Sequence, residues 1–169
     1  MASMEIERSE EEVRRDIRVI LHDIRSAHNV GSMFRTGDAI GVSRIYLSGF
    51  TPSPTDRFKR PVKEIAKTAL GAEQTIPWEY HTEILSLINE LKRDGFTVLG
   101  IEQDTRSVDY KTYTAPQKSV IIVGSEVEGM SEALRAYCDV LLEIPMRGKK
   151  ESLNVAVAFG VALFRICDQ

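Results

Sequence analysis

The stretch that decides the fold is residues 119–164, SVIIVGSEVEGMSEALRAYCDVLLEIPMRGKKESLNVAVAFGVALF. It opens with a short, β-branched apolar run at 120–123, which predicts a buried strand that ends at Gly124. A glycine loop and a short helix over 131–137 follow. A second strand is predicted over 140–144, and it ends at Pro145 because proline lacks the N–H that a central ladder needs.

The last part of this stretch predicts a helix that begins at Ser152, with the serine hydroxyl as its N-cap. From Leu153 to Phe164 this helix has almost no polar face. A helix that is apolar all round must be buried. In a chain of 169 residues the easiest way to bury it is partly in the core and partly against a second subunit. We therefore expect a homodimer.

Strands and helices alternate through the rest of the chain, without an internal repeat. This alternation predicts an α/β fold with a mostly parallel sheet and helices on both faces. Residues 1–16 are expected to form an N-terminal lead-in, and 17–169 a single domain. Ligands of such sheets bind outside the carboxyl ends of the strands. The other predicted strands cover 18–21, 44–47 and 96–101, a short extended piece covers 75–78, and the other helices cover 29–40, 62–70 and 83–93.

Composition excludes several classes of protein. No apolar run approaches the roughly 20 residues that span a bilayer, and the N-terminal residues are too acidic and polar for a signal peptide. We expect no membrane contact and a cytoplasmic location. The formal net charge of -3 argues against a broadly basic surface. Cys138 and Cys167 fit neither a disulfide framework nor a zinc spacing, and we expect no metal.

Three segments carry residues suited to chemistry, and each has a simpler interpretation by itself. In HNVGSMFR, residues 28–35, Asn29 is a candidate helix cap, and Gly31 lies one turn from Arg35, where it would clear space beside the arginine. The segment GSEVEGM, 124–130, lacks the lysine of a phosphate-binding P-loop and can be a tight turn. In IPMRGKKESLN, 144–154, the serine can be merely a cap.

Together and in this order, the three segments resemble the motifs of the SpoU (TrmH-type) RNA 2′-O-ribose methyltransferases of the SPOUT superfamily. The resemblance runs from 28 to 164 and includes KTALGAE at 67–73. It implies a SPOUT fold with a C-terminal deep trefoil knot. It also implies an obligate homodimer whose active site is shared between subunits, and methyl transfer from S-adenosylmethionine to a ribose 2′-hydroxyl without a metal.

The resemblance also implies roles for individual residues. Arg35 would hold the central catalytic position; because arginine stays protonated, we expect it to grip a phosphate and stabilise oxyanion charge rather than act as a base. Asn29 would orient Arg35, both coming from the partner subunit, and Glu126, Ser152 and Asn154 would complete the acceptor side. The implied cofactor-binding residues are Ile101, Glu102, Gly124, Ile144, Met146, Ser152 and Leu153.

Clusters of basic residues predict the RNA contacts. Arg57, Lys59, Arg60 and Lys63 precede or begin the helix at 62–70, and Arg147 and Lys149 lie in the loop beside the expected cofactor site. The chain shows no added RNA-binding extension, which favours tRNA as the substrate. Three alternatives remain: a ribosomal RNA 2′-O-methyltransferase, a non-catalytic RNA-binding SPOUT protein, and a SPOUT enzyme that methylates a base nitrogen, which Arg35 in its NVGSMFR context disfavours.

Overall fold

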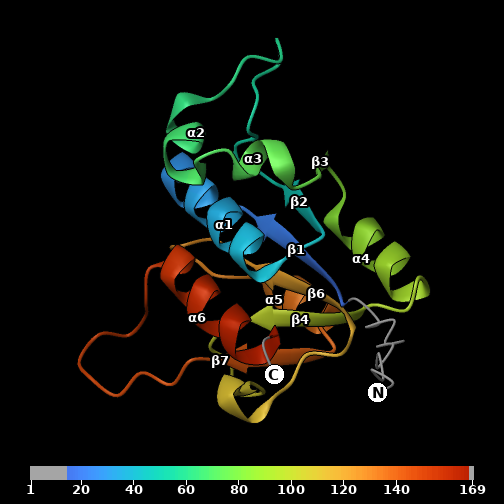
Figure 1. The fold of residues 1–169 in the computed structure, drawn as a ribbon. Helices are drawn as coiled ribbons and strands as arrows, with labels where there is room; N and C mark the ends of the chain where they lie inside the picture. The colour runs from blue at the N-terminus through green and yellow to red at the C-terminus, as the bar shows by residue number, and fades with distance from the viewer. Residues whose placement is uncertain (1–14, 168–169) are drawn as a thin grey trace, which may run out of the picture.

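The computed structural model describes residues 15–167, which form alternating strands and helices (Figure 1). The strands are β1 (Asp16–His22), β2 (Arg44–Ser48), β3 (Trp78–His81), β4 (Thr97–Ile101), β5 (Val108–Asp109), β6 (Lys118–Val123) and β7 (Val140–Glu143). The helices are α1 (Ala27–Ile40), α2 (Lys63–Ala69), α3 (Ala72–Thr75), α4 (Ile84–Arg93), the 3-10 helix η1 (Tyr110–Thr112), α5 (Glu132–Tyr137) and α6 (Val155–Cys167).

Within the described residues the strands make one seven-stranded sheet in the order β3-β2-β1-β6-β4-β7-β5. Every strand pair in it is parallel. The run at 120–123 forms the C-terminal part of β6, which lies between β1 and β4 and places Ile121 opposite Val19 and Leu99. The α/β class with a parallel sheet is therefore confirmed.

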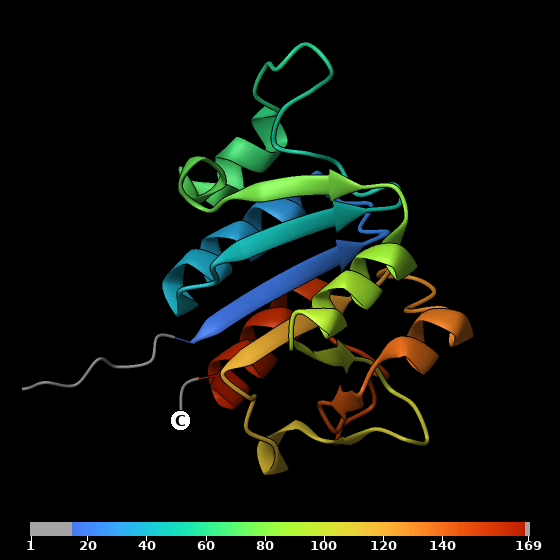
Figure 2. The same cartoon turned by 90° about the vertical axis from the view of Figure 1, so that its right-hand side faces the viewer.

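Helices cover both faces of the sheet, as the alternation of elements predicts. Ile121 and Val123 of β6 face a core shared with α1 and α6, whereas Val120 and Ile122 face a core shared with α4 and α5. Figure 2 shows α4 and α5 in front of the sheet and α1 and α6 behind it. Burial on both faces explains why this strand is a continuous apolar run rather than an alternating one.

The N-terminal boundaries differ from the prediction by a few residues. β1 begins at Asp16, inside the expected lead-in, and residues 1–14 of that lead-in lie outside the described part of the chain. α1 begins at Ala27, because the Ser26 hydroxyl rather than the Asn29 side chain caps it; Ser26 Oγ accepts a hydrogen bond from the Asn29 N–H at 3.1 Å. The prediction of Asn29 as the helix cap was therefore wrong.

The extended piece expected at 75–78 is also different. Thr75 ends α3, and the strand begins only at Trp78, where it pairs with β2. Gly71, which follows α2 and Leu70, has a φ of 94°, which an L-residue rarely adopts. Leu70 just before it also adopts a positive φ, so the chain reverses between α2 and α3.

Gly31 leaves room for a different neighbour from the one expected. A β-carbon at this position would lie 2.0 Å from Thr68 Oγ1 and 2.4 Å from the Ile65 carbonyl oxygen, both in α2. Glycine therefore lets α1 and α2 approach each other closely. Arg35, one turn further along α1, is exposed.

The last helix is only half buried by its own chain. Phe159, Leu163 and Ile166 are fully buried against the sheet, but Val157, Val161 and Phe164 remain 51%, 39% and 47% exposed. Within residues 15–167 no helix is both long and apolar enough to span a membrane. The knot stays a prediction.

Candidate active site

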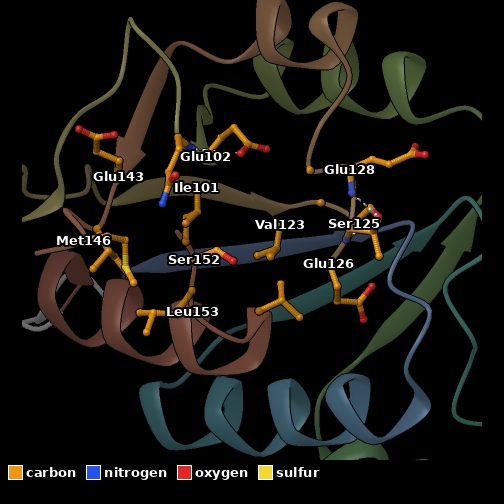
Figure 3. Close-up of a pocket in the computed structure, with 17 residues that line it drawn as sticks. Ile101, Glu102, Val123, Ser125, Glu126, Glu128, Glu143, Met146, Ser152 and Leu153 are labelled. Atoms are coloured by element: carbon orange, nitrogen blue, oxygen red, sulfur yellow. Dashed lines mark hydrogen bonds between the residues drawn. The ribbon is translucent and has the colours of Figure 1, made fainter. Parts of the chain in front are cut away.

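A pocket of about 260 Å³ opens at the carboxyl ends of β4, β6 and β7 (Figure 3). The loop at 144–153 and the first turn of α6 close its other side. This is the edge of a parallel sheet where ligands are expected. All the residues predicted to bind the cofactor line the pocket: Ile101, Glu102, Gly124, Ile144, Met146, Ser152 and Leu153.

The lining combines an apolar surface with negative charge. Apolar side chains from three strand ends and from α6, including Ile101, Val123 and Val155, offer a surface for a flat ring. Four carboxylates lie around it and no lysine or arginine of the described chain does; the carboxylates are those of Glu102, Glu126, Glu128 and Glu143. An apolar shelf ringed by carboxylates suits a ligand with an aromatic part and a positive charge, and S-adenosylmethionine has both.

The loop at 124–130 forms the end of the pocket and is tied to β4 by Glu102. The Glu102 carboxylate accepts a hydrogen bond from the Met130 N–H at 2.7 Å. A β-carbon at Gly129, whose φ is 66°, would lie 2.4 Å from Glu102 Oε2, and one at Gly124 would lie 2.9 Å from the Met130 nitrogen. Both glycines are therefore needed for the loop to fold back this tightly.

Glu126 extends from this loop toward the N-terminus of α1. Its carboxylate accepts hydrogen bonds from the Arg25 N–H at 3.1 Å and the Ser26 N–H at 3.3 Å. Burial raises the pKa of Glu126, but these N–H groups and the Asn29 amide outweigh it and lower the pKa below its usual value. A carboxylate at a helix N-terminus is also favoured by the helix dipole, so Glu126 stays ionised at neutral pH.

A chain of hydrogen bonds joins the three sequence motifs at this point. Asn154 Oδ1 accepts from the N–H groups of Ala156 and Val157, at 2.9 and 3.3 Å, and so caps α6. Its Nδ2 therefore faces outward and donates to Asn29 Oδ1 at 3.4 Å. The Asn29 Nδ2 in turn donates to Glu126 Oε1 at 3.4 Å. Because α6 fixes the orientation of the Asn154 amide, the Asn29 amide that accepts from it also has only one orientation that satisfies its hydrogen bonds.

Ser152 does not cap the last helix, contrary to the prediction. The helix begins three residues later, and Asn154 provides the cap. Ser152 is exposed and lines the pocket. The loop that holds it is fixed beside β4 by a hydrogen bond of 2.8 Å from Gln103 Nε2 to the Glu151 carbonyl oxygen.

Arg35 lies apart from the other predicted catalytic residues of its own chain. It is exposed and does not line the pocket, but borders a separate hollow with the turn between α2 and α3. Six residues separate it from Asn29, about 9 Å along a helix. Among the described residues no hydrogen bond or ion pair joins Arg35 to Asn29, so the orienting role predicted for Asn29 has no counterpart within one chain.

The predicted RNA-binding residues are exposed at two separate places in the chain. Arg57, Lys59 and Arg60 lie before α2 and Lys63 is its first residue, while Arg147 and Lys149 lie in the loop that closes the pocket. Figure 1 shows both loops projecting from the body of the molecule. The structure does not bring the two clusters together.

An ion-pair network that adjoins the pocket carries no local sequence signal. Asp104, just after β4, binds Arg106 at 2.9 Å and Arg135 of α5 at 3.4 Å, and the hydrogen bonds from Arg106 hold the pKa of Asp104 well below its usual range. This network fixes the chain that follows Glu102. A charge pattern such as Asp-x-Arg indicates a turn at most, and the distant arginine cannot be read from it.

The chain belongs to the SpoU rRNA methylase family, whose model matches residues 16–164. Its 23S rRNA (guanosine-2′-O-)-methyltransferase relative RlmB from Ralstonia nicotianae is 36% identical over 155 residues, which cover 89% of this chain and 58% of the relative. The chain spans less than three fifths of the length of the curated relatives it matches. The family predicted from the three motifs is thus confirmed.

Solved structures agree with this assignment. An AdoMet-bound rRNA methyltransferase from Sinorhizobium meliloti superposes with a TM-score of 0.79 at 30% identity, over 89% of this chain and 55% of that one. A TrmH/SpoU tRNA modifying enzyme from A. aeolicus superposes with a TM-score of 0.76 at 26% identity, over 90% of this chain and 74% of that one. The fold is therefore that of the SpoU-type methyltransferases.

Proposed function

We propose that this chain transfers a methyl group from S-adenosylmethionine to a ribose 2′-hydroxyl of RNA. The observation that carries the proposal is the hydrogen-bonded chain from Asn154 through Asn29 to Glu126 at the mouth of the pocket. It unites residues from all three motifs of a methylase family. When bound, S-adenosylmethionine supplies a sulfonium methyl that the 2′-oxygen attacks in line, with the C–S bond breaking as the O–C bond forms.

The residues around the pocket have different roles in that reaction. Backbone groups at the ends of β4, β6 and β7 and the apolar side chains hold the cofactor, and the nearby carboxylates favour its positive charge. Glu126 is a poor general base because its pKa is lowered. It instead keeps the amides of Asn29 and Asn154 in one orientation and, with Ser152, positions the acceptor ribose.

Arg35 acts in this proposal from the second subunit of a homodimer. Its guanidinium is exposed and lies outside the pocket of its own chain, which supports a role in a neighbouring site. A planar fork of donors suits a phosphate and the negative charge that develops on the 2′-oxygen. The proton leaves to a phosphate or to another group of the substrate.

The exposed stripe on α6 supports the dimer. Val157, Val161 and Phe164 follow each other at helical spacing on one side of the helix. Val161→Glu would place a charge in the middle of this stripe. We expect it to make the protein monomeric in sedimentation at micromolar concentration and to reduce methyl transfer, while cofactor binding measured by calorimetry persists. A wild-type protein that sediments as a monomer would remove the dimer from the proposal.

The substrate proposed is tRNA, with reaction in the cytoplasm. Similar proteins include both an rRNA methyltransferase and a tRNA modifying enzyme, so the test must offer both. Labelled S-adenosylmethionine is incubated with total tRNA or with ribosomal RNA, and the digested nucleosides are identified. We expect a 2′-O-methylnucleoside from tRNA, and none from DNA of the same sequence, which lacks the 2′-hydroxyl.

Two other outcomes would contradict parts of this proposal. Label found only in ribosomal RNA would mean that the substrate is ribosomal RNA and not tRNA, while the proposed reaction would stand. No label in either RNA, with the cofactor still bound, would favour a non-catalytic RNA-binding protein.

A further inference from the structure

The loop at residues 54–62, between β2 and α2, exposes an aromatic ring at its tip. We call it the Phe58 loop. Phe58 is 62% exposed, and Figure 1 shows the loop projecting from the molecule beside α2. Burial of an apolar ring is favourable, so this ring forgoes most of the gain that a core position offers.

The backbone of the Phe58 loop is tightly organised around Asp56. The Asp56 carboxylate accepts hydrogen bonds from the N–H groups of Phe58 at 2.8 Å and Arg60 at 3.0 Å, and from Arg60 Nε at 2.8 Å. The backbone pairs Asp56 with Arg60 and Thr55 with Pro61, as in a hairpin. The ring is therefore presented by a preorganised turn rather than by a loose tether.

Cations surround the exposed ring. The Arg57 guanidinium lies 4.7 Å and the Arg60 guanidinium 5.0 Å from the centre of the Phe58 ring. Lys59, at the turn itself, is exposed and has a positive φ of 61°. Against the single negative charge of Asp56, the tip thus carries an excess of positive charge next to an aromatic face.

We propose that Phe58 stacks on an unpaired base of the RNA substrate while Arg57 and Lys59 contact the adjacent phosphates. This inference rests on the proposed function and names the part of the RNA that the loop reads. Proteins that bind single-stranded nucleic acid combine an aromatic stacking platform with a basic backbone contact. Bases in a duplex are already stacked, so the loop selects a nucleotide in an RNA loop or bulge.

Charge and size favour RNA over a protein partner at this surface. A stable protein interface needs about 800 Å² on each side with an apolar centre. The Phe58 loop offers one ring encircled by charged side chains, which suits a polyanion with flat bases. It is also far in the chain from the α6 stripe proposed for the dimer.

The test compares variants of Phe58 and of Arg57 in binding to two RNAs, measured by fluorescence anisotropy at several salt concentrations. One is a labelled hairpin with an unpaired loop; the other is a duplex of the same stem. We expect Phe58→Ala to weaken hairpin binding about tenfold and duplex binding less than about twofold. Phe58→Trp keeps an aromatic ring and should bind the hairpin like the wild type. Phe58→Leu keeps only the bulk of the side chain and should bind the hairpin more weakly than the wild type.

The salt dependence separates stacking from charge. Arg57→Gln should reduce the slope of log affinity against log salt by about 0.7, the value for one phosphate contact on a single strand. Phe58→Ala should leave that slope unchanged. Thermal unfolding of each variant controls for folding, and sedimentation tests whether a second copy of the chain covers the ring instead.

Three results would overturn the inference: unchanged hairpin binding by Phe58→Ala, an equal loss for hairpin and duplex, or a loss of self-association in this variant. The methyl-transfer assay distinguishes this failure from failure of the proposed function. If the wild type transfers methyl groups and Phe58→Ala transfers them equally well, only the stacking inference falls. If the wild type binds no RNA and transfers nothing, the function itself falls.

Discussion

The pocket at the ends of β4, β6 and β7 and the face formed by α1, α2 and the Phe58 loop are built in opposite ways. The pocket is hollow, made largely of backbone turns and apolar side chains, and ringed by four carboxylates. The α1–α2 face is exposed and carries Arg35 and the basic residues of the loop. One region suits a small cation with a flat ring, and the other suits a polyanion.

The difference teaches where the two kinds of specificity come from. The shape of the pocket depends on glycines at positions where a residue with a side chain would not fit, such as Gly124 and Gly129. Charge at the other face depends on exposed side chains. The two regions meet where Glu126 reaches the N-terminus of α1 and where Asn29 hydrogen-bonds both Glu126 and Asn154, so variants can be sorted by which region they disturb.

The largest effect expected is that of Arg35→Ala on catalysis. Because Arg35 lies outside the pocket, the variant should bind S-adenosylmethionine within about twofold of the wild type. Its methyl transfer should fall by about 10²–10³, the usual cost of removing a donor that stabilises developing charge. Single-turnover transfer and calorimetry measure the two quantities.

Arg35→Lys is the matched control for this variant. It keeps the charge but lacks the planar fork of donors, so its transfer rate should lie between those of the wild type and Arg35→Ala. If cofactor binding fell as much as transfer in either variant, Arg35 would have a structural role and the division between the two regions would be lost.

The next effect concerns the packing of the α1–α2 face. Gly31→Ala should lower the free energy of unfolding by about 1–3 kcal/mol, because its β-carbon would overlap Thr68 and the Ile65 carbonyl. Gly37→Ala in the same helix meets nothing closer than 3.6 Å. It should be neutral or stabilising by up to about 1 kcal/mol. Urea unfolding of both variants tests the contrast, and equal stabilities would show that α1 and α2 can separate at no cost.

A smaller effect is expected at the junction of the two regions. Asn154→Ala removes the cap of α6 and should cost about 1 kcal/mol of stability. Asn154→Asp keeps an acceptor for the helix N–H groups but loses the donor to Asn29. It should therefore unfold like the wild type, yet transfer methyl groups up to about tenfold more slowly. Wild-type transfer by Asn154→Asp would mean that the link to Asn29 has no role in the reaction.

The smallest effect expected is a pH dependence of stability from Glu126. Its pKa in the folded chain lies below the usual value of 4.5. Its ionised form therefore contributes stability above that value, and the contribution is lost as pH falls through the folded pKa. Glu126→Gln should be less stable than the wild type by under about 1 kcal/mol at neutral pH, since the group is half-exposed.

Urea unfolding across the acid range measures this contribution. The difference between Glu126→Gln and the wild type should vanish in acid. A difference that stayed constant with pH would show that the carboxylate charge is not what joins the two regions.

The sequence predicted the elements that are decided locally. The β-branched run at 120–123 lies in β6, and the helix predicted over 83–93 is α4, which buries the apolar side chains of Leu87, Ile88 and Leu91. Both strand and helix follow from the period of their apolar residues. The three motifs likewise identified the family, because each keeps its residue types at fixed spacing.

The details that failed depend on contacts between distant residues. Ser26 and Asn29, and likewise Ser152 and Asn154, are equally good caps by residue type, and the path of the chain decides between them. The partner of Gly31 lies on another helix, and Glu126 meets an amide 97 residues earlier. No local pattern contains such information, so the positions of site residues were predicted better than their interactions.

The strand order has a consequence for how this protein is synthesised. β6 separates β1 from β4 in the sheet, although both precede it in the chain. On the ribosome, the sheet of β1, β2 and β3 and the strand β4 therefore have no common edge until residues 118–123 leave the exit tunnel. Such distant parallel pairing is slow. The growing chain exposes the unpaired edge of β1 from residue 22 until β6 is made, and that of β4 from residue 101, and chaperones are most useful to it at that stage.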